Sequence, residues 1–269
     1  IFQMSLTYND SDDNIIVKFR TIQGSVIRNL FESVKEILTD VNINFLSDSI
    51  KCTAIDGNKI ACVYFKLEAD KFEVYTLNEP ITAGINMQSL FKLIKTVTNN
   101  DTVSMIIYRN ERYKLHIIVE NSEKHTCTRS ILKLLDIDQE IITIPNVEFD
   151  NIITMQCTDF QRYCKDMMTI SNVVTMTCKN NVFALSCSGD FADQIIEIHE
   201  CDSIVTKDGD EEISETFSLK YINLFVKSTS LCSIVEIYLK KDFPLILVYR
   251  IGSLGKIQFC LAPQDTSSH

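Results

Sequence analysis

Lysine and arginine recur at helical spacing in four separate segments of the chain. Each segment carries two of them, three or seven positions apart, which places both on one face of a helix. The pairs are Arg28 and Lys35, Lys92 and Lys95, Arg162 and Lys165, and Lys220 and Lys227. Cations arranged in this way can contact phosphate groups whatever the base sequence. The alternative is an ordinary solvated helix face, which Glu32, Glu36 and Asp166 favour because they dilute the positive charge.

The residue types that carry catalysis or bind metals form no comparable pattern. The four histidines are His116, His125, His199 and His269, and none has the spacing of a metal-ligand set. His199-Glu200-Cys201-Asp202 is dense, but neighbours on a strand point to opposite faces. No phosphate-binding glycine loop or nucleophile motif is present. We therefore expect no enzyme activity, no catalytic residue, no metal site and no cofactor.

The totals describe a globular chain. It has 269 residues, 45% hydrophobic and 23% charged, enough to bury a sizeable core. The ten cysteines contain no Cys-x-x-Cys pair, and most lie in alternating apolar segments, which is typical of reduced thiols inside a cell. We expect no signal peptide and no membrane partner. The net charge of −10 argues against nucleic-acid binding only if the cations are not gathered on one surface.

These basic segments must be held by a scaffold made mostly of strands. Alternating apolar and β-branched residues predict strands at 60–67, 103–108, 115–119, 173–178, 183–187, 195–198, 234–239, 245–249 and 257–261. Asn110-Glu111 and Asn180-Asn181 predict hairpin turns. Helical spacing predicts helices over 25–38, 87–96, 158–168 and 219–228.

The four helices are evenly spaced along the chain. Arg28 to Lys95 spans 67 positions and Arg162 to Lys227 spans 65, while the two halves are offset by 134 and 132. This spacing indicates one domain plan used twice. The joint falls near 136–145, an acidic and then apolar stretch that ends at Pro145.

Several short motifs, in order, resemble the eukaryotic-type sliding clamp, the proliferating cell nuclear antigen family. They include Ile22-Gln23-Gly24-Ser25, Ala54-Ile55-Asp56-Gly57-Asn58-Lys59, Ala83-Gly84-Ile85-Asn86, Ser186-Cys187-Ser188-Gly189-Asp190, Leu219-Lys220-Tyr221-Ile222-Asn223 and Leu261-Ala262-Pro263. The resemblance runs from about residue 16 to 263.

The resemblance implies an α+β fold of two repeated clamp domains, each with antiparallel sheets and two helices. The implied domains are 16–135 and 148–263, joined by an interdomain connecting loop at 136–147. Residues 1–15 are an N-terminal extension in which Met4 is a candidate natural start and Ile1-Phe2-Gln3 a candidate cloning remnant. Three subunits would close head to tail through edge strands near 126–133 and 191–199.

The family carries channel-facing Lys or Arg at the positions of all eight basic residues named above. Its partner pocket would be lined here by Ile55, Ile142, Ile144, Pro145, Pro244, Leu261, Ala262 and Pro263, with Lys59 and Gln264 at the rim. From the residues alone, the preferred interpretation of Ile142 and Ile144 is a crossover strand in the core. Cys260 stands where the family usually has tyrosine, and residues 5–14 have no counterpart.

The expected function is that of a DNA polymerase processivity factor. A homotrimer would encircle duplex DNA and tether a polymerase, a clamp loader and other replication and repair proteins that carry a clamp-binding peptide. It would work in the nucleus, or at a cytoplasmic replication site if the source is viral. The alternative is a subunit of a heteromeric, checkpoint-type clamp with different partner chains.

Overall fold

The computed structural model describes residues 14–138, 142, 147–149, 151–179, 182–199, 203–206 (backbone only) and 212–264. The first half contains β1 (Ile15–Thr21), α1 (Gly24–Val34), β2 (Asp40–Phe45), β3 (Ser49–Ile55), β4 (Ala61–Glu68), β5 (Val74–Leu77), β6 (Ile81–Asn86), α2 (Met87–Ile94), β7 (Asp101–Tyr108), β8 (Lys114–Asn121) and β9 (Thr126–Lys133). The second half contains β10 (Asn151–Gln156), α3 (Cys157–Met167), β11 (Val173–Lys179), β12 (Val182–Ser188), β13 (Asp193–Ile198), β14 (Ser203–Thr206), β15 (Ile213–Ser218), α4 (Leu219–Phe225) followed by the 3₁₀ turn η4 (Val226–Ser230), β16 (Ile234–Leu239), β17 (Leu245–Ile251) and β18 (Gly255–Leu261).

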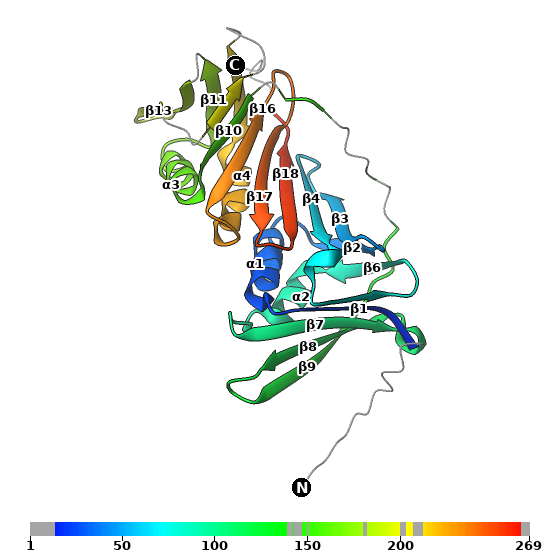
Figure 1. Cartoon of the computed structure of the whole chain (residues 1–269). Helices are drawn as coiled ribbons and strands as arrows, with labels where there is room; N and C mark the ends of the chain where they lie inside the picture. The colour runs from blue at the N-terminus through cyan, green and yellow to red at the C-terminus, as the bar shows by residue number, and fades with distance from the viewer. Residues whose placement is uncertain are drawn as a thin grey trace.

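Both halves follow the same order of one strand, a helix, five strands, a helix and three strands (Figure 1). Each half therefore supplies one five-stranded group and one four-stranded group. The sheet orders are β5-β1-β7-β8-β9, β13-β12-β11-β15, and a nine-stranded sheet β14-β10-β16-β17-β18-β4-β3-β2-β6. The predicted α+β fold of two repeats with antiparallel sheets is confirmed.

The nine-stranded sheet crosses from one half to the other at a single strand pair. Strands β18 and β4 pair antiparallel, from Gly255 opposite Leu67 to Leu261 opposite Ala61. A Cβ at Gly255 would lie 2.0 Å from the Lys66 carbonyl oxygen, so this end of the pair requires glycine. We call this β18–β4 pair the joint.

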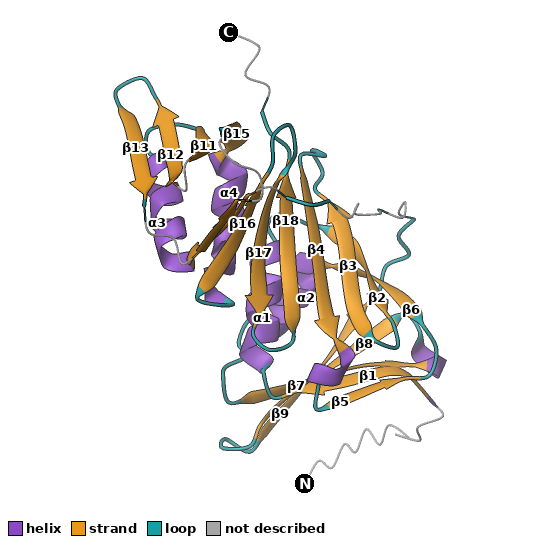
Figure 2. Ribbon diagram, turned by 45° about the horizontal axis from the view of Figure 1, so that its top comes forward, coloured by secondary structure: helices purple, strands orange, loops and turns teal. Residues whose placement is uncertain are grey.

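Alternation along the strands buries one face of each sheet beneath the helices. On β4, for example, Ala61, Val63, Phe65 and Leu67 are buried while the residues between them are half-buried on the other face. Figure 2 shows α1, α2 and α4 together on one face of the nine-stranded sheet. The helices and the inner faces share one continuous apolar core.

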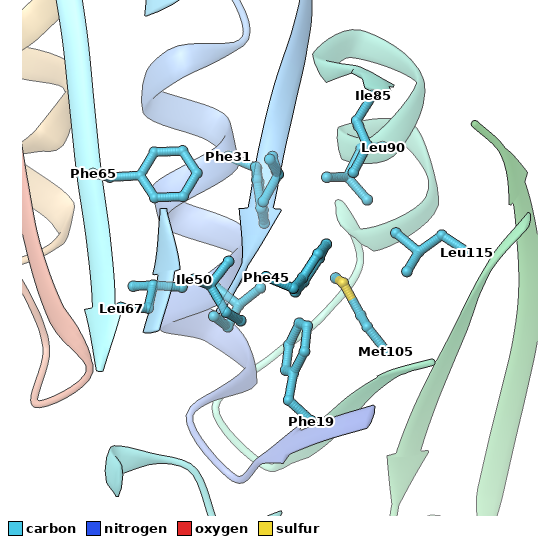
Figure 3. A pocket seen from close by; sticks show the side chains of 12 residues that line it. Phe19, Phe31, Phe45, Ile50, Phe65, Leu67, Ile85, Leu90, Met105 and Leu115 are labelled. Carbon is cyan, nitrogen blue, oxygen red and sulfur yellow. The ribbon is translucent and has the colours of Figure 1, made fainter. Parts of the chain in front are cut away.

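A small void lies within this core in the first half. It measures about 20 Å³ and is lined only by apolar side chains, among them Phe19, Phe45, Phe65 and Met105 (Figure 3). A water molecule needs polar partners, which this lining does not offer, so we interpret the void as a dry packing defect rather than a ligand site.

Most predicted elements are present, with local differences at their ends. Helix α1 ends at Val34, four residues early, because the Ile37 and Leu38 amides both bond back to the Val34 carbonyl and turn the chain. The predicted hairpin at Asn110-Glu111 is confirmed, since β7 and β8 pair antiparallel across the 3₁₀ turn Arg109–Glu111. The turn expected at Asn180-Asn181 lies outside the described residues.

Candidate functional site

The four helices present a positively charged outer side. Their buried residues are apolar and face the sheets, for example Ile27, Leu30 and Val34 on α1 and Phe160, Cys164 and Met167 on α3. Helix α1 contacts α2, α4 and η4, so the helices of the two halves form one layer. Six of the eight predicted cationic residues are exposed, and the two on α1 and its end, Arg28 and Lys35, are half-buried.

Acidic neighbours neutralise part of this layer. Over 24–38, 87–96, 157–168 and 219–230, eight basic residues stand against four acidic ones, which leaves a charge of +4 in a chain whose total is −10. Arg162 pairs with Asp159 at 3.1 Å, and Lys227 pairs with Glu36 across the helix layer. The Lys35 ammonium lies over the Phe91 ring, 4.1 Å from its centroid.

Four of the six exposed cations have no such internal partner among the described residues. Within the described part of the chain, no ion pair involves Lys92, Lys95, Lys165 or Lys220. All four side chains are exposed. These lysines, one pair on α2 and one each on α3 and α4, are therefore the most available for an anionic ligand.

The opposite face of the nine-stranded sheet carries an apolar patch over the joint. Ile55 pairs with Cys62, Cys62 with Cys260, and Cys260 with Ile246, so one outward row crosses four strands. The Ala262 amide bonds to the Ile60 carbonyl at 3.1 Å, and Pro244 precedes the pair Leu245–Leu261. A second outward row, Pro244, Ala262 and Ile60, therefore runs beside the first. We call these seven residues the joint patch.

The structure separates the predicted pocket residues into three groups. Ile55 is 45% exposed, and Pro244, Ala262 and Lys59 are exposed as well. Ile142 and Pro263 are half-buried, whereas Leu261 is wholly buried and supports the patch from the core side. Ile144 and Pro145 lie outside the described residues.

Sequence reasoning missed three members of the joint patch, Ile60, Cys62 and Ile246, although each has the alternation of an outward strand residue. It connected Cys260 with the pocket only through the family's tyrosine at that position. The missing information was the register between β4, β17 and β18, because it decides which outward residues meet.

A hydrogen-bonded carboxylate holds the turn beside this patch. Asp56 accepts hydrogen bonds from the Ile60 and Ala61 amides at 2.8 and 2.7 Å, and from the Asn58 amide at 3.0 Å. The Tyr221 hydroxyl on α4 also donates to it, at 2.8 Å. Burial alone would raise the pKa of Asp56, but these four hydrogen bonds outweigh it and lower the pKa. The turn that carries Lys59, with its φ of 60°, is thus fixed to the second half of the chain.

Among the longer described strands, two end their sheets with open edges. Strand β9, with eight residues, and β13, with six, are terminal strands. The other long edges are partly covered, since Leu135 bonds to Gly84 on β6 and Gln264 bonds to Thr216 on β15. Ile131 on β9 is 49% exposed, and Ile195 on β13 is 69% exposed.

The described residues offer little other chemistry. They contain no group of three His, Cys, Asp or Glu side chains that could hold a metal ion. No described helix is both long enough and apolar enough to cross a membrane.

Two copies of one strand-and-helix plan, joined edge to edge beneath a basic helix layer, define a two-domain clamp fold. Comparison with known proteins agrees with this class. The family model "Proliferating cell nuclear antigen, N-terminal domain" matches residues 16–141, and "Proliferating cell nuclear antigen, C-terminal domain" matches 143–264.

Two relatives match along nearly their whole length. The "Probable DNA polymerase sliding clamp 1" of Paramecium bursaria Chlorella virus 1 is 36% identical over 257 residues, covering 94% of this chain and 98% of the relative. The "Proliferating cell nuclear antigen" of Chaetomium thermophilum is 29% identical over 255 residues, covering 93% and 98%. The chain belongs to the proliferating cell nuclear antigen family. It is a sliding clamp, a DNA polymerase processivity factor and not an enzyme.

The Asp56–Tyr221 bond gives a prediction about stability. Tyr221→Phe removes a hydrogen bond to a carboxylate and should lower the free energy of unfolding at pH 7 by about 1.5–3 kcal/mol. The folded-state pKa of Asp56 lies below its ordinary value of 3.8, so its stabilisation is present above that pH and is lost as pH falls through the folded-state pKa. The free energies of unfolding of wild type and Tyr221→Phe, measured in urea, should therefore converge as the pH falls below the folded-state pKa of Asp56.

Tyr238→Phe is the matched control for this measurement. The Tyr238 hydroxyl donates to Glu236 at 2.7 Å within the same strand, so its loss breaks no bond between the halves. A gap between wild type and Tyr221→Phe that stays constant with pH would contradict the assigned role of Asp56.

Proposed function

We propose that this clamp closes head to tail as a homotrimer. The observation that carries the proposal is which two strands of the repeated plan form the open edges. In the repeated plan, β9 is the counterpart of β18 and β13 is the counterpart of β4. The joint pairs β18 with β4 inside the chain, so β9 of one subunit can pair with β13 of the next in the same manner. Such pairing satisfies every long open edge when the ring closes.

Duplex DNA is the proposed content of the ring. The helix layer, with its net charge of +4, would line the channel and contact phosphates, while the rest of each acidic chain repels DNA. The proposed contact residues are Arg28, Lys35, Lys92, Lys95, Arg162, Lys165, Lys220 and Lys227. Loose contacts of this kind leave the clamp free to slide, and the closed ring rather than affinity keeps it on DNA. Its place of action would be the nucleus, or a cytoplasmic replication site for a viral clamp.

The joint patch is the proposed docking site for partner proteins. Outward apolar side chains over two strands of each half, beside an ordered turn, are an unusual exposed surface for a protein of this acidity. A polymerase, a clamp loader or another partner would insert a peptide with a glutamine, then an aliphatic residue, then paired aromatics. The aromatics would pack on Ile55, Pro244 and Ala262, with Pro263, Ile142, Ile144 and Pro145 completing the walls and Lys59 at the rim.

The proposed subunit contact predicts the effect of a charge on β13. Ile195→Arg places a cation on the open edge strand and should give folded monomers, because the side chain is exposed in the single chain. Ile196 is less suitable, since it packs against the core. Val74→Arg, on the terminal strand β5, is the control and should remain trimeric. Light scattering measures the mass.

Two outcomes of this experiment would count against the homotrimer. A trimer that survives Ile195→Arg would place the contact elsewhere. A wild-type chain that is monomeric on its own, at concentrations where related rings close, would favour the heteromeric clamp.

The four exposed helix-layer lysines without an internal ion pair, Lys92, Lys95, Lys165 and Lys220, predict the effect on DNA. Replacing Lys92, Lys95, Lys165 and Lys220 by glutamate should reduce non-specific duplex binding at low salt and flatten its salt dependence, with the trimer intact. The control variant replaces Lys51, Lys71, Lys124 and Lys256, which lie outside the helix layer, by glutamate, so the change in net charge is the same. Fluorescence anisotropy on duplex DNA compares the two. An equal loss of DNA affinity in both variants would show that total charge, and not the helix layer, determines binding.

The docking proposal predicts which variants lose peptide binding. Burial of one aromatic ring contributes about 1.5–3 kcal/mol, and a charge in the wall should remove most of it. Ile55→Asp and Ile142→Asp should therefore abolish calorimetric binding of the peptide without changing the oligomeric state. Ile22→Asp, at a side chain 62% exposed outside the patch, is the control. Unchanged affinity in both Ile55→Asp and Ile142→Asp would place the docking site elsewhere.

A further inference from the structure

Two cysteines face each other across the joint. Cys62 on β4 and Cys260 on β18 are register partners, and both are half-exposed. The Ala262 amide donates to the Ile60 carbonyl, so these two residues form a hydrogen-bonded antiparallel pair. Hydrogen-bonded and non-hydrogen-bonded pairs alternate along an antiparallel ladder, so Cys260 and Cys62, two residues further along, also form a hydrogen-bonded pair. Such pairs hold their Cα atoms about 5.5 Å apart, within the roughly 4.4–6.8 Å that a disulfide needs.

The two thiols already interact. A hydrogen bond from Cys260 lowers the pKa of the Cys62 thiol, although burial opposes the shift. The same hydrogen bond, together with burial, raises the pKa of Cys260. Cys62 is therefore the more readily ionised thiol of the pair, and we assign it as the nucleophile.

We propose that Cys62 and Cys260 form a reversible disulfide across the joint when the protein meets hydrogen peroxide. The Cys62 thiolate attacks one peroxide oxygen, the O–O bond breaks, and Cys62 becomes a sulfenic acid while the leaving hydroxide takes up the proton that Cys62 released and departs as the first water. The Cys260 sulfur then attacks the Cys62 sulfur, the S–O bond breaks, and the leaving hydroxyl takes the Cys260 proton and departs as the second water. Two thiols are oxidised and one peroxide is reduced to two waters. A dithiol reductant reverses the reaction.

Other described cysteines fit this chemistry less well. Cys157 and Cys232 also share a hydrogen bond, but Cys157 is 1% exposed and peroxide cannot reach it in the folded chain. Cys52, Cys164, Cys178 and Cys187 are buried, and Cys127 lies exposed on β9. The Cys62–Cys260 pair combines direct strand pairing with access from solvent.

The disulfide would alter the joint patch, a consequence that rests on the proposed docking function. Cys62 and Cys260 lie between Ile55 and Ile246 in the outward row. As thiols they can rotate aside for an aromatic ring, whereas a disulfide fixes both sulfurs above the joint. It also closes a loop of about 200 residues, from Cys62 to Cys260, which restricts the unfolded chain. The oxidised form should therefore melt at a higher temperature and bind the peptide more weakly.

Disulfide mapping tests the bond itself. The full chain is reduced, treated with hydrogen peroxide, alkylated, digested and examined by mass spectrometry. Wild type and the control Cys232→Ser should yield the Cys62–Cys260 linkage and lose two thiols, and Cys260→Ser should not. Free alkylated Cys62 and Cys260 in treated wild type, or a Cys157–Cys232 linkage in their place, would overturn the proposal.

Calorimetry with the clamp-binding peptide tests the consequence. Oxidised wild type should bind about tenfold more weakly than reduced wild type, a loss of roughly half of one aromatic contact. Dithiothreitol should restore the affinity of oxidised wild type. The peptide affinity of Cys260→Ser should be the same before and after peroxide treatment. No binding by reduced wild type would refute the docking function, while the mapping would still decide the disulfide. Equal affinity of both mapped forms would refute the effect on docking alone.

Discussion

Antiparallel pairing of β18 with β4 is the interaction on which the rest of this structure depends. It joins the five-stranded group of the second half to the four-stranded group of the first, and so turns two domains into one continuous sheet. Backbone groups on a strand edge need partners, and an edge without one invites pairing with another chain. Because the domain plan is used twice, the same two kinds of edge recur unpaired at β9 and β13. The joint inside the chain is thus the template for the contact that we propose between chains.

The two faces of the joined sheet acquire different chemistry from strand alternation. Inward residues pack under four helices, and the amphipathic helices turn their lysines and arginines outward. Outward residues at the Leu261–Ala61 end of the joint are apolar and come from both halves, so the joint patch exists only when the halves are paired. The Asp56–Tyr221 bond spans the same boundary and holds the neighbouring turn. A polymerase tether and a sliding surface can therefore occupy opposite faces of one rigid sheet.

Local patterns in the sequence were sufficient for the helices, many strands and the duplication, because these follow from periodicity and spacing. Strands such as β2, β3 and β6 were not singled out, and register was out of reach. Cys62 lies opposite Cys260 through pairing between distant segments, which no local pattern encodes. The face that packs on the core was also out of reach: Leu261, expected in the pocket, lies in the core, and Ile195 rather than Ile196 faces solvent. The charged helix faces needed no register, since helical spacing alone determines them.

Hydrogen exchange at the amides of β9 and β13 tests the central claim most directly, because it measures whether those edges are paired. If β9 and β13 pair between subunits as β18 and β4 pair within the chain, the amides on their open edges should be protected from exchange in the assembled protein. These amides should lose that protection when the protein is diluted to monomers. The amides of β4 and β18 should stay protected in both states. Rapid exchange on β9 and β13 in the assembled protein, as expected for a free edge, would contradict the account.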